Sequence, residues 1–226
     1  MLSAPSPAIP NESLKDKITN DLRKAYNEIL EKHLDGRTIK EDKINSWMNN
    51  ILIEAKDYFI KKYPDYSIFL YNTVYPRNIY FRSNATSISI PNTDWVDCIS
   101  FTTDNLYSIL YFFFYKNTNL DYNVEEKENE IIQKGNNLLQ KHLDDRKYDY
   151  DKVATYNKNI IDEHIEFILK TDKSVRCFCI NEIYQIPIQS KYYFKYISYG
   201  KEISSKIFQT YINDSLIAYH SLFFFK

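Results

Sequence analysis

The sequence predicts an α+β fold of two tandem modules, each with two helices followed by a four-stranded antiparallel sheet. Three observations support this prediction. A segment of the first half recurs in the second half, a stripe of apolar residues marks one helix in each copy, and short aromatic segments separated by turn residues follow that helix. A chain of 226 residues, 44% of them hydrophobic, is long enough to form two small domains with packed cores.

The repeat is clearest in a hexapeptide. Lys-His-Leu-Asp-Gly-Arg at positions 32–37 returns as Lys-His-Leu-Asp-Asp-Arg at positions 141–146, an offset of 109 residues (141 − 32). The same offset aligns Asp-Lys-Ile at 42–44 with Asp-Lys-Val at 151–153 without a gap. Near the end of each copy, Asp-Asn-Leu at 104–106 and Asn-Asp-Ser-Leu at 213–216 both precede an aromatic run. Matches at nearly one offset indicate an internal duplication.

Apolar residues spaced three and four positions apart predict the second helix of each copy. In the first copy they are Ile44, Trp47, Ile51, Ala55, Tyr58 and Phe59, and the residues at the equivalent positions of the second copy are Val153, Tyr156, Ile160, His164, Phe167 and Ile168. We expect helices over Ser13–Leu34 and Lys40–Lys62, and again over Val124–Leu143 and Asp149–Lys170. Pro64 marks the end of the second helix, because the residue before a proline disfavours helical backbone.

Alternating, aromatic-rich segments then predict four strands in each copy. The expected strands are Tyr66–Tyr75, Ile79–Ile90, Trp95–Thr103 and Leu106–Tyr115, followed by Ser174–Gln185, Lys191–Tyr199, Ser204–Ile212 and Ser215–Phe225. The domain organisation is therefore a flexible N-terminus at 1–11, a first module at 12–115, a linker at 116–123 and a second module at 124–226. A linker of this length spans at most about 28 Å, so we expect the second module to dock beside the first.

Composition argues against several classes of function. Lys and Arg number 29 against 30 Asp and Glu, so no basic excess attracts nucleic acid or an anionic membrane, and no apolar run is long enough to span a bilayer. Glycines number only 3, and no Walker loop, Rossmann fingerprint, Gly-x-Ser-x-Gly elbow or His-Glu-x-x-His motif occurs. We therefore expect no catalytic residues, no cofactor and no metal. The 3 cysteines, with no signal peptide, indicate reduced thiols and a cytoplasmic location.

The ordered pattern resembles a known family. Ile44-x-x-Trp47-x-x-x-Ile51 in a second helix, four strands after it, and a short polar step at 213–216 into a final aromatic strand together resemble Tctex-type dynein light chains. The resemblance covers nearly the whole chain, twice over. Members of that family form homodimers that exchange a strand, so the resemblance implies that this chain builds the dimer internally, as a monomeric pseudo-dimer.

The same resemblance implies a non-catalytic adaptor. An exposed sheet edge accepts an extended peptide as a further strand, and the family's exchanged second strand is the implied receiving edge. The implied partner-binding residues are Phe81, Ser83 and Ala85 in the first copy and Tyr193, Lys195 and Ile197 in the second. The implied partner is a disordered segment, such as one from a dynein intermediate chain, and the implied setting is the cytoskeleton or axoneme.

Other interpretations of the sequence remain open. The chain is alternatively a scaffold subunit of a complex other than dynein, or a small-ligand or degenerate enzyme domain with a pocket between the modules. Cys177 and Cys179 share one strand face, which fits a buried structural role better than a metal site. His164 falls on the apolar stripe, as a core histidine or as a pH-sensitive interface contact. His33 and His142 end helices, where an imidazolium interacts favourably with the helix dipole.

Overall fold

The computed structural model describes residues 13–77, 79–88, 94–116, 126–172, 175–186, 193–200 and 203–225. The helices are α1 (Leu14–Leu34), α2 (Glu41–Lys62), α3 (Glu128–Leu143) and α4 (Tyr150–Thr171). The strands are β1 (Tyr66–Pro76), β2 (Phe81–Ile88), β3 (Asp94–Thr102), β4 (Leu106–Lys116), β5 (Arg176–Gln185), β6 (Tyr193–Tyr199), β7 (Ile203–Ile212) and β8 (Leu216–Phe225). The predicted α+β class, with four helices and two four-stranded antiparallel sheets, is confirmed.

Most element boundaries agree with the predicted ranges to within a few residues. The largest difference is at α3, which begins at Glu128 rather than at Val124, because residues 126–127 form a turn. The predicted flexible N-terminus at 1–11 lies outside the described residues, as does the predicted linker apart from Lys116, which ends β4. Among the helices described, none is long and apolar enough to cross a membrane.

The second strand of each half pairs with the first strand of the other half. Sheet A has the strand order β3-β4-β1-β6, and sheet B has the order β2-β5-β8-β7. In sheet B, Ser83 of β2 lies opposite Glu182 of β5, and in sheet A, Lys195 of β6 lies opposite Asn72 of β1. Each sheet therefore combines three strands from one half of the chain with one strand from the other half.

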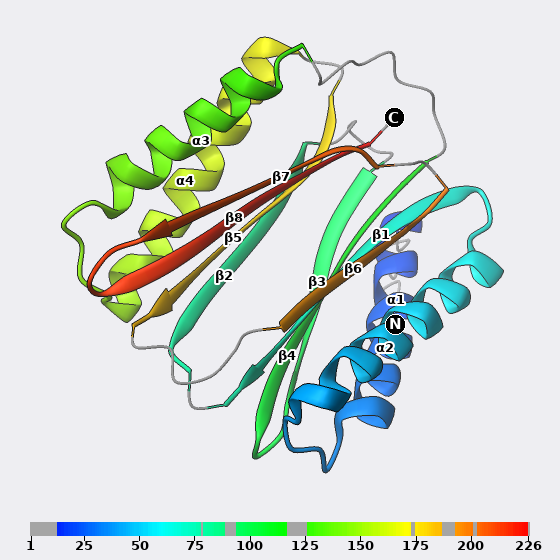
Figure 1. The fold of residues 1–226 in the computed structure, drawn as a ribbon. Helices are drawn as coiled ribbons and strands as arrows, with labels where there is room; N and C mark the ends of the chain where they lie inside the picture. The colour runs from blue at the N-terminus through cyan, green and yellow to red at the C-terminus, as the bar shows by residue number, and fades with distance from the viewer. Residues whose placement is uncertain are drawn as a thin grey trace, which may run out of the picture.

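The two sheets lie between two pairs of helices (Figure 1). α1 and α2 cover the outer face of sheet A, and α3 and α4 cover the outer face of sheet B. Between the sheets lies a layer of aromatic side chains from both, in which Phe69 of β1 packs against Phe178 and Phe223 with ring centroids 5.1 and 4.7 Å apart. Aromatic rings bury large apolar areas, so this layer contributes strongly to stability. The exchanged strands also pack on helices of the other half, β6 on α2 and β2 on α4.

The repeated hexapeptide ends α1 and α3 with the same backbone geometry. Its leucine is buried, and the N–H of its aspartate donates to the carbonyl four residues earlier, at 2.9 Å in both copies. The fifth position is left-handed, with φ of 63° at Gly36 and 56° at Asp145, which closes the helix end. The arginine then stacks on an aromatic ring of the next helix, Arg37 on Trp47 and Arg146 on Tyr156, at 5.5 and 5.6 Å. The repeat thus encodes a helix-terminating turn.

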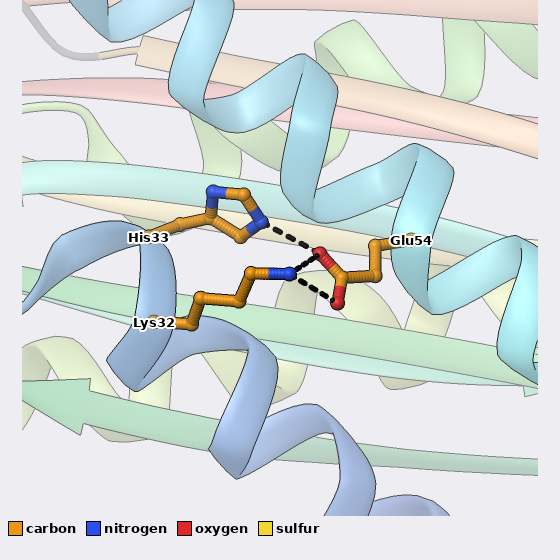
Figure 2. A network of polar contacts seen from close by, with 3 residues as sticks. All are labelled: Lys32, His33 and Glu54. Carbon is orange, nitrogen blue, oxygen red and sulfur yellow. Dashed lines mark hydrogen bonds and ion pairs between the residues drawn. The ribbon is translucent and has the colours of Figure 1, made fainter.

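The first two residues of the hexapeptide link the helices of each pair. Figure 2 shows Lys32 and His33 of α1 at the carboxylate of Glu54 on α2, with Lys32 Nζ 2.8 Å from Oε1 and His33 Nε2 2.8 Å from Oε2. The second half has the same contacts at 2.7 and 2.9 Å, made by Lys141, His142 and Glu163. Hydrogen bonds from the lysine first, and from the histidine as well, lower the pKa of both glutamates. We call each set a helix clamp.

We predict that the two helix clamps contribute equally to stability. Glu54→Gln and Glu163→Gln should each lower the free energy of unfolding at pH 7 by about 0.5–1 kcal/mol, because these partly exposed pairs are screened by solvent. Since the folded pKa of each glutamate is depressed, the contribution is present above its ordinary pKa of 4.5 and is lost as pH falls through the folded value. Urea denaturation measures this effect.

The control is Glu166→Gln, which removes an ion pair to Lys170 within one exposed turn of α4. That change should have a smaller effect, since an isolated pair on one helix surface contributes about 0.3–0.5 kcal/mol. Equal losses in all three variants would show that the helix clamps do not hold the helix pairs together.

Candidate strand-binding edges

Each sheet has two edge strands, and two of the four are protected against further pairing. In β3 the carboxylate of Asp97 is held by Arg23 of α1 through two hydrogen bonds of 2.6 and 2.8 Å. In β7 the pairing with β8 shifts register between Ile203 and Ser205. Edge charges and bulges discourage the addition of another strand. The exchanged strands β2 and β6 pair without a register shift and are therefore the candidate receiving edges.

The backbone of β2 shows which residues face its open side. Gln185 N donates to Tyr80 O at 3.1 Å, so Tyr80 and Gln185 form a hydrogen-bonded pair at the start of the β2–β5 ladder. Residues alternate along an antiparallel ladder, so the backbone groups of Phe81, Ser83 and Ala85 point away from β5. The three residues predicted for this strand therefore present their N–H and C=O groups to the open edge.

The open side of β6 lies one residue away from the prediction. Arg77 N donates to Asn105 O at 3.2 Å, so odd-numbered residues of β1 pair with β4 and even-numbered residues pair with β6. The partners on β6 are Tyr193, Lys195, Ile197 and Tyr199, whose backbone groups are used within the sheet. The open edge of β6 is instead formed by the backbone of Phe194, Tyr196 and Ser198.

The one-residue difference comes from the register assigned to β6. Thr73 and Glu182 occupy equivalent positions at the repeat offset of 109 (182 − 73), and they lie opposite Phe194 and Ser83. Phe194 is therefore the equivalent of Ser83 at an offset of 111 (194 − 83), two more than in β1 and β5. The predicted residues stand at an offset of 112 from those of β2 (193 − 81), one residue beyond this register, and a slip of one residue turns every group to the other side.

The two edges have diverged in their side chains. On β2, Phe81, Ser83 and Ala85 face the layer between the sheets, and the serine and alanine are small. On β6, Phe194 is 37% exposed and its ring lies 6.3 Å from that of Phe208 on β7, which is 50% exposed. Tyr193 and Ile197 pack toward α1 and α2 instead. The β2 edge thus combines one aromatic ring with two small side chains, whereas the β6 edge carries the aromatic rings of Phe194 and Tyr196.

A buried carboxylate fixes β2 against sheet A. Glu182 of β5 is only 1% exposed and accepts hydrogen bonds from the hydroxyls of Tyr75, Tyr71 at 3.4 Å and Ser83 at 3.3 Å. Tyr111 OH donates to the same serine at 2.8 Å. Burial, followed by the Glu182 charge, raises the pKa of Tyr75, which keeps its hydroxyl protonated as a donor. Glu182 was not predicted as a site residue, although an acidic residue within a strand as rich in apolar side chains as 175–184 was a usable signal.

A buried ion pair links the sheets a second time. Arg176 of β5 donates to Asp94 of β3 at 2.7 and 3.1 Å, and both side chains are fully buried. The guanidinium also lies over the ring of Tyr115 at 4.4 Å. Breaking a buried pair leaves an uncompensated charge, so this contact favours one relative position of the two sheets. The equivalents of Glu182 and Arg176 in the first half are the small, neutral Thr73 and Ser67.

Two buried histidines form a hydrogen-bonded pair. His164 of α4 and His220 of β8 are both fully buried, with Nδ1 of the first 2.8 Å from Nε2 of the second. His164 Nε2 lies 3.0 Å from the carbonyl of Ile131, so it must carry a proton and donate. His164 Nδ1 is then an acceptor, and His220 Nε2 donates to it. Burial lowers the pKa of His164 to about 4 and that of His220 well below its usual range, so both rings are neutral.

The cysteines lie in two different environments. Cys177 and Cys179 are buried on the outer face of sheet B, where burial raises the pKa of both thiols, whereas Cys98 on β3 is exposed. Cys179 Sγ is 3.9 Å from His220 Nε2. Within the described ranges, no group of three or more His, Cys, Asp and Glu side chains could hold a metal ion.

Comparisons of the sequence give no family assignment. No model of a known protein family matches it, and a search of curated proteins finds no significant match. The geometry of the β2 and β6 edges and the pattern of the repeat are therefore the observations that bear on function.

We predict that the histidine pair makes the fold acid-sensitive. Because the folded pKa is depressed, the unfolded state binds more protons below the ordinary histidine value of 6.5, so stability falls as pH drops from 6.5 toward 4. For His164 the full loss is about 3 kcal/mol. Urea denaturation at several pH values should show this slope, and the His164→Leu/His220→Leu double variant should have a flatter profile. An equal slope in both proteins would contradict the assignment.

Proposed function

We propose that the protein is a non-catalytic adaptor that binds an extended, disordered segment of a partner by adding it as a further strand to β2 or β6. The observation that carries the proposal is the outward-facing backbone of these two exchanged strands. Unpaired N–H and C=O groups at a regular edge give affinity, while alternating side chains give selectivity. The resemblance to Tctex-type dynein light chains suggests a dynein intermediate chain as the partner, in the cytoplasm and on the cytoskeleton or axoneme.

The exchange also supports an internal pseudo-dimer. Family members exchange the second strand between two protomers, and in this chain the second strand of each half pairs with the other half. Because both modules belong to one chain, every molecule carries one β2 edge and one β6 edge. Because the two edges are no longer constrained to be identical, they can select different segments, one beside Phe81 and the small Ser83 and Ala85, the other beside Phe194 and Tyr196. A scaffold subunit of another complex would use the same edges.

The pseudo-dimer predicts the mass of the protein in solution. Light scattering should give a mass near 27.1 kDa that does not change on dilution, since no second chain is needed to complete either sheet. A constant mass near twice this value would mean that the exchange occurs between chains, and would reject the internal pseudo-dimer.

Strand addition predicts that proline substitutions at the open edge abolish binding without unfolding the protein. Ala85→Pro removes an N–H that faces outward, whereas Asn84→Pro removes one that pairs with β5. We therefore expect Ala85→Pro to keep its thermal stability within a few degrees, and Asn84→Pro to be strongly destabilised. Ser198→Pro tests β6 in the same way.

The binding assay uses a purified disordered segment of a dynein intermediate chain, followed by calorimetry and amide hydrogen exchange. On binding at β2, the amides of Ser83 and Ala85 should gain protection, while those of Arg82 and Asn84 are protected in both states. A bound segment that protects neither strand edge, or that still binds the Ala85→Pro and Ser198→Pro double variant, would reject strand addition. Failure of this segment to bind would reject dynein as the partner.

A further inference from the structure

A cavity at the start of β2 points to a specific chemistry in the bound segment. It has a volume of about 590 Å³ and lies at the start of β2, beside the ends of β1 and β3 and the start of α4. Four aromatic side chains line it, those of Tyr80, Phe81, Tyr107 and Tyr150. Phe81 and Ser83 belong both to this lining and to the open edge of β2. A strand added to that edge therefore runs past the cavity, and one of its side chains can enter it.

The charge of the cavity is positive. Its described lining contains Arg77 and Arg82 and no acidic residue. Arg77 Nη1 donates to Thr103 O at 2.8 Å and lies 3.6 Å from the carboxylate of Asp104, which is fully exposed. A pair so exposed contributes little and is readily exchanged for another carboxylate.

The side chain of Arg82 is positioned by contacts with Tyr150. Its guanidinium lies 3.5 Å from the centre of the Tyr150 ring, and its Nε donates to the Tyr150 carbonyl at 3.4 Å. These two contacts hold the guanidinium against Tyr150. Among the described residues, no carboxylate lies within ion-pair distance of it. A planar, pre-oriented guanidinium matches the two oxygens of a carboxylate.

The equivalent position on the other edge has a different chemistry. Asn72 and Asn181 are equivalent in the repeat, and they lie opposite Lys195 and Asn84. Lys195 is therefore the equivalent of Asn84. Two residues earlier, Tyr193 is the equivalent of Arg82. At the repeat offset of 109, Tyr150 corresponds to Glu41 (150 − 109). The stacked arginine and tyrosine therefore belong to the β2 edge and are not reproduced at β6.

We infer that the β2 edge selects an extended segment carrying an aspartate or glutamate beside an aromatic or aliphatic residue, with the carboxylate held by Arg82 and Arg77 and the apolar side chain held by Phe81 and Tyr107. This inference rests on the proposed strand addition. The half-buried rings of Phe81 and Tyr107 provide apolar contact, and the two guanidiniums provide the charge that the acidic residue requires.

The test is a selection of displayed random 12-residue peptides on the full-length chain. Peptides that lose binding to the Ala85→Pro variant are synthesised with a fluorescent label and measured by anisotropy. We expect them to carry an acidic residue next to an apolar one. Replacing that acidic residue by its amide should weaken binding to the wild type about tenfold to a hundredfold, as for a lost charge-assisted hydrogen bond.

Two variants of the protein test whether Arg82 binds the acidic residue of the peptide. For binding to the Arg82→Gln protein, replacing the acidic residue of the peptide by its amide should weaken the affinity less than about twofold, because the arginine that pairs with that residue is already absent. The matched control is Arg146→Gln, which also loses an arginine stacked on a tyrosine, here Tyr156 at 5.6 Å. That variant should behave like the wild type. Binding to the wild type should also weaken more steeply with salt than binding to Arg82→Gln.

The outcomes separate the inference from the proposed function. Peptides that depend on the β2 edge but tolerate the loss of their acidic residue would overturn the inference and leave strand addition in place. An equal loss in the Arg82→Gln and wild-type proteins would overturn it as well. A selection that returns no peptide sensitive to Ala85→Pro would overturn strand addition at β2, and the inference with it.

Discussion

The structure depends on two strand pairings between the halves of the chain, β2 with β5 and β6 with β1. Without them each half would retain three strands, and the inner strand β1 or β5 would have one unpaired side. Buried backbone groups must be hydrogen-bonded, so each half needs a strand from the other to complete its sheet. The layer of aromatic rings between the sheets and the packing of β2 on α4 and β6 on α2 follow from this exchange.

The buried polar groups make the exchange specific. Glu182 and Arg176 both belong to the second half, and their partners Tyr75, Tyr71 and Asp94 belong to the first. A sandwich assembled from two second halves would bury two carboxylates and two guanidiniums without these partners, which costs several kcal/mol per ion, in the range of about 3–5 kcal/mol for each broken pair. The duplication has thus lost its symmetry at the positions where identical halves would otherwise pair with each other.

The elements of the fold could be predicted from the sequence because their signals are local. Helices follow from the spacing of Ile44 and Ile51, strands from alternating aromatic residues, and the duplication from one repeated hexapeptide. The residues at the open edge of β6 were less accessible, because they depend on the register of β6 against β1, and a slip of one residue turns every group to the other side. The partners of His33 and Glu182 were inaccessible for another reason: a sequence shows a charged residue but not which helix or sheet lies across from it.

The exchange also determines the order in which the chain can fold during synthesis. β1 is complete at Pro76, but its partner β6 ends at Tyr199, so the first half leaves the ribosome long before its sheet can close. Contacts between such distant segments form slowly, because closing the long loop between them costs chain entropy before the strand pairing can offset it. Throughout that interval the nascent chain carries an unpaired strand edge and a layer of uncovered aromatic rings, two features that promote aggregation.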